Sequence, residues 1–162
     1  MGDDPRRDFP ASENRTPLDF LERQAAPGPA LDRDYAIDSF ELHTHPDLTE
    51  RLKNVAGKQR VLLRPAYGCP LIVAPTGVAF ALAHGQRLLA FRLPTETRDL
   101  AREMGAVERP DLGEGWFGFD AWAPDVPMKK HLGDLAYFCE EAHRHALGPG
   151  SAERRSPRTR SS

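Results

Sequence analysis

The sequence predicts one small α+β domain, and three observations support this prediction. Short apolar stretches between residues 60 and 93 are separated by turns that contain Gly or Pro, a pattern typical of antiparallel hairpins. A further apolar strand is expected over residues 116–122. Segments with helical periodicity flank the strands, and this order favours helices packed on one face of an antiparallel sheet.

Three helices are predicted around the strands, at residues 45–57, at 95–104 and from Pro127 onward. Gly57 and Gly105 follow the first two helices, where a glycine commonly ends a helix, and Thr95 is expected to cap the second. The last helix has an apolar stripe with alternating spacings of four and three, which comprises Met128, Leu132, Leu135, Cys139, Ala142 and Ala146. The predicted order is α-β-β-β-β-α-β-α, a two-layer sandwich of helices on a sheet of four to five strands.

The folded domain is expected to cover residues 39–147, between two polar ends. Residues 1–38 combine charged residues with Pro, Ala and Gly, which predicts a flexible tail that docks at most loosely, with one short helical turn at Leu18, Phe20 and Leu21. Residues 148–162 are rich in Ser, Arg and Pro and are expected to be disordered. Four arginines and one glutamate give this end a charge of +3, which raises the hypothesis of a nucleic-acid module. The overall charge of −2 argues against that partner.

The composition is that of an ordinary globular protein, with 40% hydrophobic and 28% charged residues among 162. No apolar run approaches the ~20 residues of a membrane span, and the start lacks the apolar stretch of a signal peptide. Two cysteines, Cys69 and Cys139, make no disulfide framework and are expected to be buried, reduced thiols. We therefore expect a cytoplasmic protein without a membrane partner.

The two faces of the sheet are predicted to differ, because side chains alternate along a strand. One face collects large apolar residues, which should meet the helices: Val61, Leu63, Phe80, Leu82, Leu89, Phe91, Leu93, Phe117 and Phe119. The other face has a floor of small residues, Ala79, Ala81 and Ala83. Around this floor lie Arg64, Arg92, Trp116, Asp120 and Trp122.

An alanine floor with aromatic and cationic walls can hold a planar or anionic ligand. The leading hypothesis is therefore a non-catalytic binding or regulatory module that uses this face. Two alternatives stay open. Arg92 and Asp120 can form a simple cross-strand ion pair, and the two Trp side chains can pack against the N-terminal tail or a second copy of the chain.

A second hypothesis is a small metal-dependent hydrolase. His43, His45 and Asp47 form an H-x-H element that resembles the first ligand pair of amidohydrolase metal sites. Such a site needs further ligands from later strands, and His45 can instead cap the helix that follows it. No P-loop or G-x-S-x-G motif occurs, and the glycines that begin at Gly113-Glu114-Gly115 follow no predicted strand, so no cofactor is predicted and catalysis stays an open question.

Two family resemblances accompany these residues. Residues 77–94, GVAFALAHGQRLLAFRLP, resemble the core hairpin of TfoX N-terminal and MmcQ/YjbR-like domains. Residues 45–52, HPDLTERL, are similar to the opening of a small bacterial domain that is called luciferase-like. The first resemblance implies a compact α/β sandwich with a regulatory or DNA-binding role. Neither resemblance implies catalytic residues or a flavin site.

Overall fold

A computed structural model describes residues 5–25 and 44–148 of the chain. The predicted α+β class and antiparallel sheet are confirmed, with six strands in the spatial order β1-β2-β3-β4-β6-β5. All neighbouring strands pair antiparallel. The strands are β1 (Leu63–Ala66), β2 (Cys69–Val73), β3 (Ala79–His84), β4 (Leu88–Arg92), β5 (Val107–Glu108) and β6 (Trp116–Asp120).

The three predicted helices are present as α2 (Pro46–Ala56), α3 (Thr95–Glu103) and α4 (Met128–Leu147). Local chemistry sets the start of α2, because His45 Nδ1 accepts a hydrogen bond from the Asp47 amide at 3.0 Å. Pro94, rather than Thr95, is the residue that precedes α3. The two-residue strand β5 has no counterpart in the predicted order, because it is too short to show periodicity.

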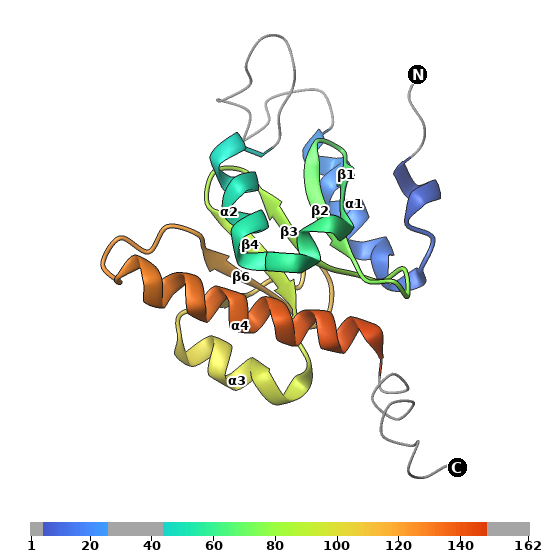
Figure 1. The fold of residues 1–162 in the computed structure, drawn as a ribbon. Coiled ribbons are helices and arrows are strands. Elements are labelled where there is room, and N and C mark those ends of the chain that lie inside the picture. Colours follow the sequence, from blue (N-terminus) through green and yellow to red (C-terminus); the bar gives the residue numbers. More distant parts are fainter. Residues whose placement is uncertain (1–4, 26–43, 149–162) are drawn as a thin grey trace.

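Helices α2 and α4 cover one face of the sheet (Figure 1). The buried apolar side chains between this face and the two helices form a cluster that we call the α4-side core; Leu52, Phe91, Phe117 and Phe138 belong to it. The apolar stripe of α4 is buried from its middle onward, at Leu135, Phe138, Cys139, Ala142 and Ala146. Met128 is 64% exposed, so the stripe reaches the sheet only after the first turns of the helix.

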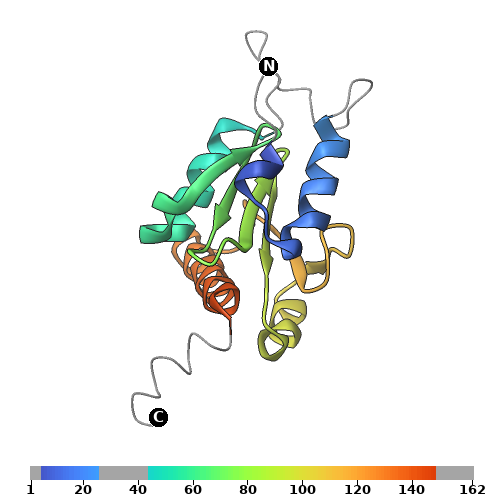
Figure 2. The same ribbon diagram turned by 90° about the vertical axis from the view of Figure 1, so that its right-hand side faces the viewer.

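The opposite face of the sheet is covered as well, which corrects the prediction of helices on one face. Residues 5–25, here called the N-terminal segment, form two 3-10 turns (Pro5–Asp8 and Ser12–Asn14) and the helix α1 (Arg15–Ala25). Figure 2 shows α1 on the side of the sheet opposite to α2 and α4. The molecule therefore has three layers.

Burial explains why the N-terminal segment is ordered where a flexible tail over residues 1–38 was predicted. Phe9, Leu18, Phe20 and Leu21 are buried against the sheet, in a cluster we call the α1-side core. These apolar residues are few and lie among Pro and charged residues, so the sequence predicted one short helical turn at Leu18, Phe20 and Leu21 where the structure has the whole of α1. Residues 26–38 and 149–162 of the two predicted tails lie outside the described residues.

Asn14 fixes the N-terminal segment to the sheet with side-chain hydrogen bonds. Its Nδ2 donates to the Gly77 carbonyl at 2.9 Å, and its Oδ1 accepts from the Ala79 amide at 2.7 Å. The side chain is fully buried, so these bonds are shielded from water. One amide thus pairs with both backbone groups at the start of β3.

An irregular pairing changes the predicted faces of β3. Ile72 pairs with Ala81 while Val73 pairs with Ala79, so one extra residue, Phe80, is inserted between the two pairs. Phe80 and Ala81 both belong to the α4-side core. Ala83 also lies in that core and Leu82 turns to the α1-side core, which reverses the predicted faces of Ala81, Leu82 and Ala83.

The predicted strand at residues 60–66 is shorter than expected. A 3-10 helix, η3 (Gly57–Leu62), occupies its first part, and only Leu63–Ala66 join the sheet. Val61 is 73% exposed as a result and does not reach the core. Among the described residues, no helix has the length and apolar character needed to span a membrane.

Candidate functional site

The five residues predicted to surround an open sheet face do not surround one pocket. Arg92 pairs with Trp116 in the ladder between β4 and β6, whereas Asp120 pairs with Leu88 at the other end of the same ladder. The Asp120 carboxylate accepts from Arg87 at 2.7 Å. The predicted cross-strand pair of Arg92 with Asp120 is therefore wrong, because the two residues lie four positions apart along the ladder.

The other predicted residues serve the fold. Trp116 is 1% exposed in the α1-side core, so the N-terminal segment covers the face on which we expected a ligand. Arg64 lies on the edge strand β1 and donates to the carbonyls of Val61 and Leu63. Trp122 lies on the other side of the sheet, against the α4-side core, where its Nε1 donates to the Gln86 carbonyl at 2.8 Å.

The H-x-H element is only partly described. His45 caps α2, which was the alternative to a metal site, and its Nδ1 accepts a hydrogen bond from the Asp47 amide. His43 lies outside the described residues. Within residues 5–25 and 44–148, no group of three or more His, Cys, Asp or Glu side chains has the arrangement of a metal site. No observation on these residues favours the hydrolase hypothesis.

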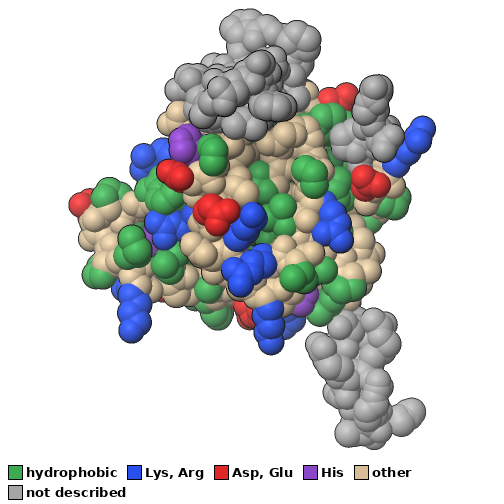
Figure 3. Space-filling view, turned by 45° about the horizontal axis from the view of Figure 1, so that its top comes forward, with side chains coloured by type: hydrophobic (Ala, Val, Ile, Leu, Met, Phe, Trp, Pro, Cys, Tyr) green, Lys and Arg blue, Asp and Glu red, His purple; other side chains and the backbone are tan. Residues whose placement is uncertain are grey.

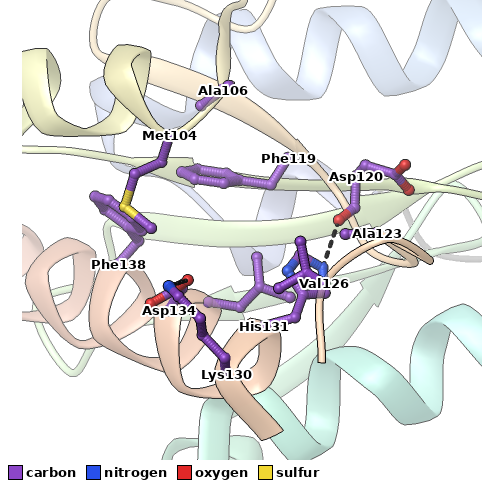
Figure 4. A pocket seen from close by; sticks show the side chains of 12 residues that line it. Met104, Ala106, Phe119, Asp120, Ala123, Val126, Lys130, His131, Asp134 and Phe138 are labelled. Carbon is purple, nitrogen blue, oxygen red and sulfur yellow. Dashed lines mark hydrogen bonds and ion pairs between the residues drawn. The ribbon is translucent and has the colours of Figure 1, made fainter. Parts of the chain in front are cut away.

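A cavity of about 250 Å³ lies between the end of α3, strand β6 and the first half of α4 (Figure 4). Away from the cavity, the start of α3 is joined to the second half of α4, where Arg144 donates to Glu96 at 2.9 Å. The cavity is lined by Met104, Gly105, Ala106, Phe119, Asp120, Ala123, Val126, Lys130, His131, Asp134, Leu135 and Phe138. We call it the α3–α4 cavity.

The floor of the α3–α4 cavity is apolar. The rings of Phe119 and Phe138 lie with centroids 5.0 Å apart at a tilt of 37°, and Leu135 is buried beside them. Met104 stands at the rim and is 41% exposed, so its flexible thioether can move without disturbing the core. This floor can take up an aromatic or aliphatic group and release its water.

The polar groups of the cavity come mainly from the start of α4. Lys130 Nζ donates to Asp134 at 2.8 Å, and His131 Nε2 lies 2.8 Å from the Asp120 carbonyl oxygen. Burial alone would raise the pKa of Asp120, but hydrogen bonds from the Trp122 amide and Arg87 lower that pKa below its usual range. The Asp120 carboxylate is thus ionised and already engaged.

A second hollow, of about 350 Å³, lies over Gly118 on the β5–β6 side of the sheet. Its two cations are held by carboxylates. Arg87 pairs with Asp120, and Arg109 pairs with Asp111 through two hydrogen bonds of 3.0 and 2.8 Å. A bound anion would have to displace these partners, which makes this hollow a weaker candidate than the α3–α4 cavity.

One chemically notable pair lies in the α1-side core. Cys69 Sγ and His84 Nδ1 are 3.4 Å apart on the neighbouring strands β2 and β3. Leu71 pairs with Leu82 in the ladder between β2 and β3. Two residues farther along this register, Cys69 stands opposite His84. The sequence pattern did not single out this pair, because its formation depends on that register. The hairpin lengths contain the only sequence signal for it.

Basic side chains on the face over α2 and η3 do not form an uninterrupted patch. Figure 3 shows Lys and Arg there among hydrophobic and acidic side chains. Lys53 pairs with Glu50 at 3.3 Å, and Arg51 lies over the ring of Trp122 at 4.5 Å. We see no phosphate-tracking stripe on this described face.

Comparison with known proteins returns no match: no family model, no curated protein and no solved structure is similar to this chain. The resemblance to TfoX N-terminal and YjbR-like domains stays a prediction. The function must therefore be argued from the site alone.

Proposed function

We propose that this protein is a small-molecule-binding module whose ligand has an apolar body and one anionic group. The hypothesis of a binding module is kept from the sequence, but its site moves from the sheet face to the α3–α4 cavity. The observation that supports this most is an apolar floor made by Phe119, Leu135 and Phe138, with polar and charged side chains from β6 and the start of α4 around it.

The size of the cavity limits the body of the ligand. A space of about 250 Å³ suits roughly a dozen non-hydrogen atoms. At roughly 0.5 kcal/mol per atom, such a ligand would bind with a Kd on the order of 10–100 μM. That range fits a sensor of a small metabolite.

The start of α4 favours an anionic group. The first turn of α4 contains no acidic residue, and no side chain caps its amides. The same turn contains two cationic residues, Lys129 and Lys130. The positive end of a helix stabilises a negative charge nearby. Lys130 is bound only to Asp134 in an exposed pair, which is worth about 0.3–0.5 kcal/mol, so it can turn to a ligand at little cost.

Calorimetric titration with hydrocinnamate, an aromatic acid of this size, tests the proposal. Phenylpropylamine is the matched control, because it has a similar body and the opposite charge. We expect the acid to bind at least about tenfold more tightly than the amine, since only the acid gains the Lys130 contact. Substitution of Lys130 with Gln should remove most of this difference. Equal binding of the two compounds would contradict the anionic group.

A pair of methionine substitutions tests the location. Met104→Trp fills the cavity from its rim and should weaken hydrocinnamate binding at least about tenfold, because the indole occupies the space of the ligand. Met128→Trp is the matched control. Met128, at the start of α4, is exposed like Met104 but does not line the cavity. If both variants bind as the unaltered protein does, the α3–α4 cavity is not the site.

A further inference from the structure

Cys69 and His84 form a thiol–imidazole pair that is sealed from solvent. The two residues are 1% and 4% exposed, with Sγ 3.4 Å from Nδ1. The ring of Phe20 on α1 meets the His84 ring edge-on, with centroids 5.3 Å apart. The N-terminal segment thus packs over this pair.

The chemistry of this pair depends on that layer. A thiol becomes a nucleophile when a neighbouring imidazole takes its proton, which creates a thiolate and an imidazolium. In an apolar core this charge separation is disfavoured, because neither ion is solvated. Contact with water removes the penalty. The covered pair is therefore dormant, and an uncovered pair is activated by its own histidine.

The cover can open without unfolding the rest of the molecule. The ion pairs of Arg6 with Asp19 and Glu22 lie within the N-terminal segment and do not tie it to the sheet. The hydrogen bonds of this segment to the rest of the molecule include those of Asn14 with Gly77 and Ala79 and one of Arg6 with Tyr67, beside the contacts of its apolar side chains. A layer held by few polar bonds opens locally at a lower free energy than global unfolding.

We propose that Cys69 is a gated modification site that forms a mixed disulfide with a small organic disulfide when the N-terminal segment opens. His84 takes the proton of the Cys69 thiol. The thiolate then attacks one sulfur of the disulfide RSSR′, a Cys69–S–S–R bond forms, and the S–S bond of the reagent breaks. The leaving thiolate R′S⁻ takes up the proton from His84, so atoms and charge balance.

Modification has a structural consequence at this place. The group added to Cys69 would need space that the α1-side core does not have, since Phe20 packs on the neighbouring His84. The modified chain therefore holds its N-terminal segment in the open state. Reduction of the mixed disulfide by a thiol restores closure.

Cys139 provides an internal control for this proposal. It is also buried, but it lies in the α4-side core, where burial raises the pKa of its thiol to about 12. Global unfolding exposes both thiols, whereas opening of the N-terminal segment exposes only Cys69. The Cys139→Ala protein reports on Cys69, and the Cys69→Ala protein reports on Cys139.

The experiment measures thiol release from dithiobis(nitrobenzoate), an aromatic disulfide. Loosening the cover with Asn14→Ala should speed the reaction of Cys69 about 10- to 100-fold, and Cys69 should react at least about tenfold faster than Cys139 in this variant, because Cys139 is exposed only by global unfolding. Leu18→Val is a gentler second variant, for which we expect roughly a threefold to tenfold increase. Equal reaction rates of the two thiols, or no acceleration of Cys69, would overturn the gating.

The role of His84 is tested in the Asn14→Ala, Cys139→Ala background. His84→Asn should slow the Cys69 reaction at pH 7 by about tenfold and move the midpoint of its pH–rate profile to that of an ordinary thiol, near about 8.5. A merely structural histidine would change the rate without moving the midpoint. An unchanged midpoint would therefore refute activation of Cys69 by His84.

Discussion

The side chain of Asn14 joins the N-terminal segment to the sheet through one donated and one accepted hydrogen bond, as paired backbone groups join neighbouring strands. Its amide meets the Gly77 carbonyl and the Ala79 amide, and water reaches none of these groups freely. A single polar side chain thereby positions an otherwise apolar layer. Asn suits this position because it has both a donor and an acceptor at the required spacing.

Substitution of Asn14 with Ala should lower the free energy of unfolding by about 2–4 kcal/mol, because two backbone groups lose their partner. Urea unfolding followed by circular dichroism measures this change. Ser12→Ala, at an exposed position of the same segment, should stay within about 0.5 kcal/mol of the unaltered protein. A loss below about 1 kcal/mol for Asn14→Ala would show that the segment does not depend on this side chain.

Two histidines near the end of α4 make stability depend on pH. Burial lowers the pKa of His143 and of His145, and the charges of Arg92 and Arg98 lower that of His145 further. The unfolded chain, with histidine pKa values of about 6.5, therefore binds more protons than the folded chain. Their stabilising contribution is complete above that pH and is lost as the pH falls through the lowered pKa values.

We therefore expect the free energy of unfolding to fall between about pH 7.5 and pH 5.5, a window above the titration of ordinary carboxylates. The double variant His143→Gln, His145→Gln should flatten this part of the profile, since glutamine does not titrate. Urea unfolding at several pH values measures both slopes. Equal slopes in the two proteins would contradict this origin of the pH dependence.

At the scale of elements, two glycines predict opposite effects of the same substitution. In β6, a Cβ on Gly118 would lie 2.7 Å from Leu88 Cδ1, so the Leu88 side chain has to move and Gly118→Ala should destabilise the fold by about 0.5–1 kcal/mol. In α4, a Cβ on Gly133 would meet nothing within 4 Å, and Gly133→Ala should stabilise the helix by about 0.5–1 kcal/mol.

Thermal unfolding of the two glycine variants measures this pair of effects in one experiment. The Tm of the unaltered protein should lie between the Tm values of the two variants. A stabilised Gly118→Ala would mean that β6 packs more loosely against β4 than the structure indicates. A destabilised Gly133→Ala would mean that this face of α4 is covered in solution.

The elements differ in how well their sequences predicted them. α4 and β4 have regular apolar patterns, and both lie as predicted against the α4-side core. β3 has an equally apolar sequence, yet its faces came out reversed after Phe80. A single inserted residue shifts the alternation of every position after it, and no local pattern shows which residue is inserted.

At the scale of the whole molecule, the sheet is covered on both faces by segments far apart in sequence. The large apolar side chains of α2 and α4 predicted one layer. The N-terminal layer was predicted only as an alternative, in which the tail packs against the Trp side chains, because Pro and charged residues separate the few side chains that anchor it, among them Phe9 and Leu18. Such a layer is stable only when a preformed sheet receives it, so local propensity does not reveal it.

The same reasoning explains the outcome for the site. The predicted residues Arg64, Arg92, Trp116 and Asp120 belong to strands, whose faces can be sorted from sequence. The α3–α4 cavity instead arises where the end of one helix meets the start of another, at Met104 and Lys130. The distance between those ends is set by tertiary packing, and the sequence contains no periodic signal for it.

A heteronuclear NMR titration of the unaltered protein with hydrocinnamate tests the central claim most directly. A ligand in the α3–α4 cavity should shift the amide signals of Met104, Gly105 and Phe119 and of residues 126–138 along one saturable curve. The signals of α1 should stay in place. Saturable shifts confined to α1 and the strand face beneath it would contradict this claim and return the site to the face that the sequence first suggested.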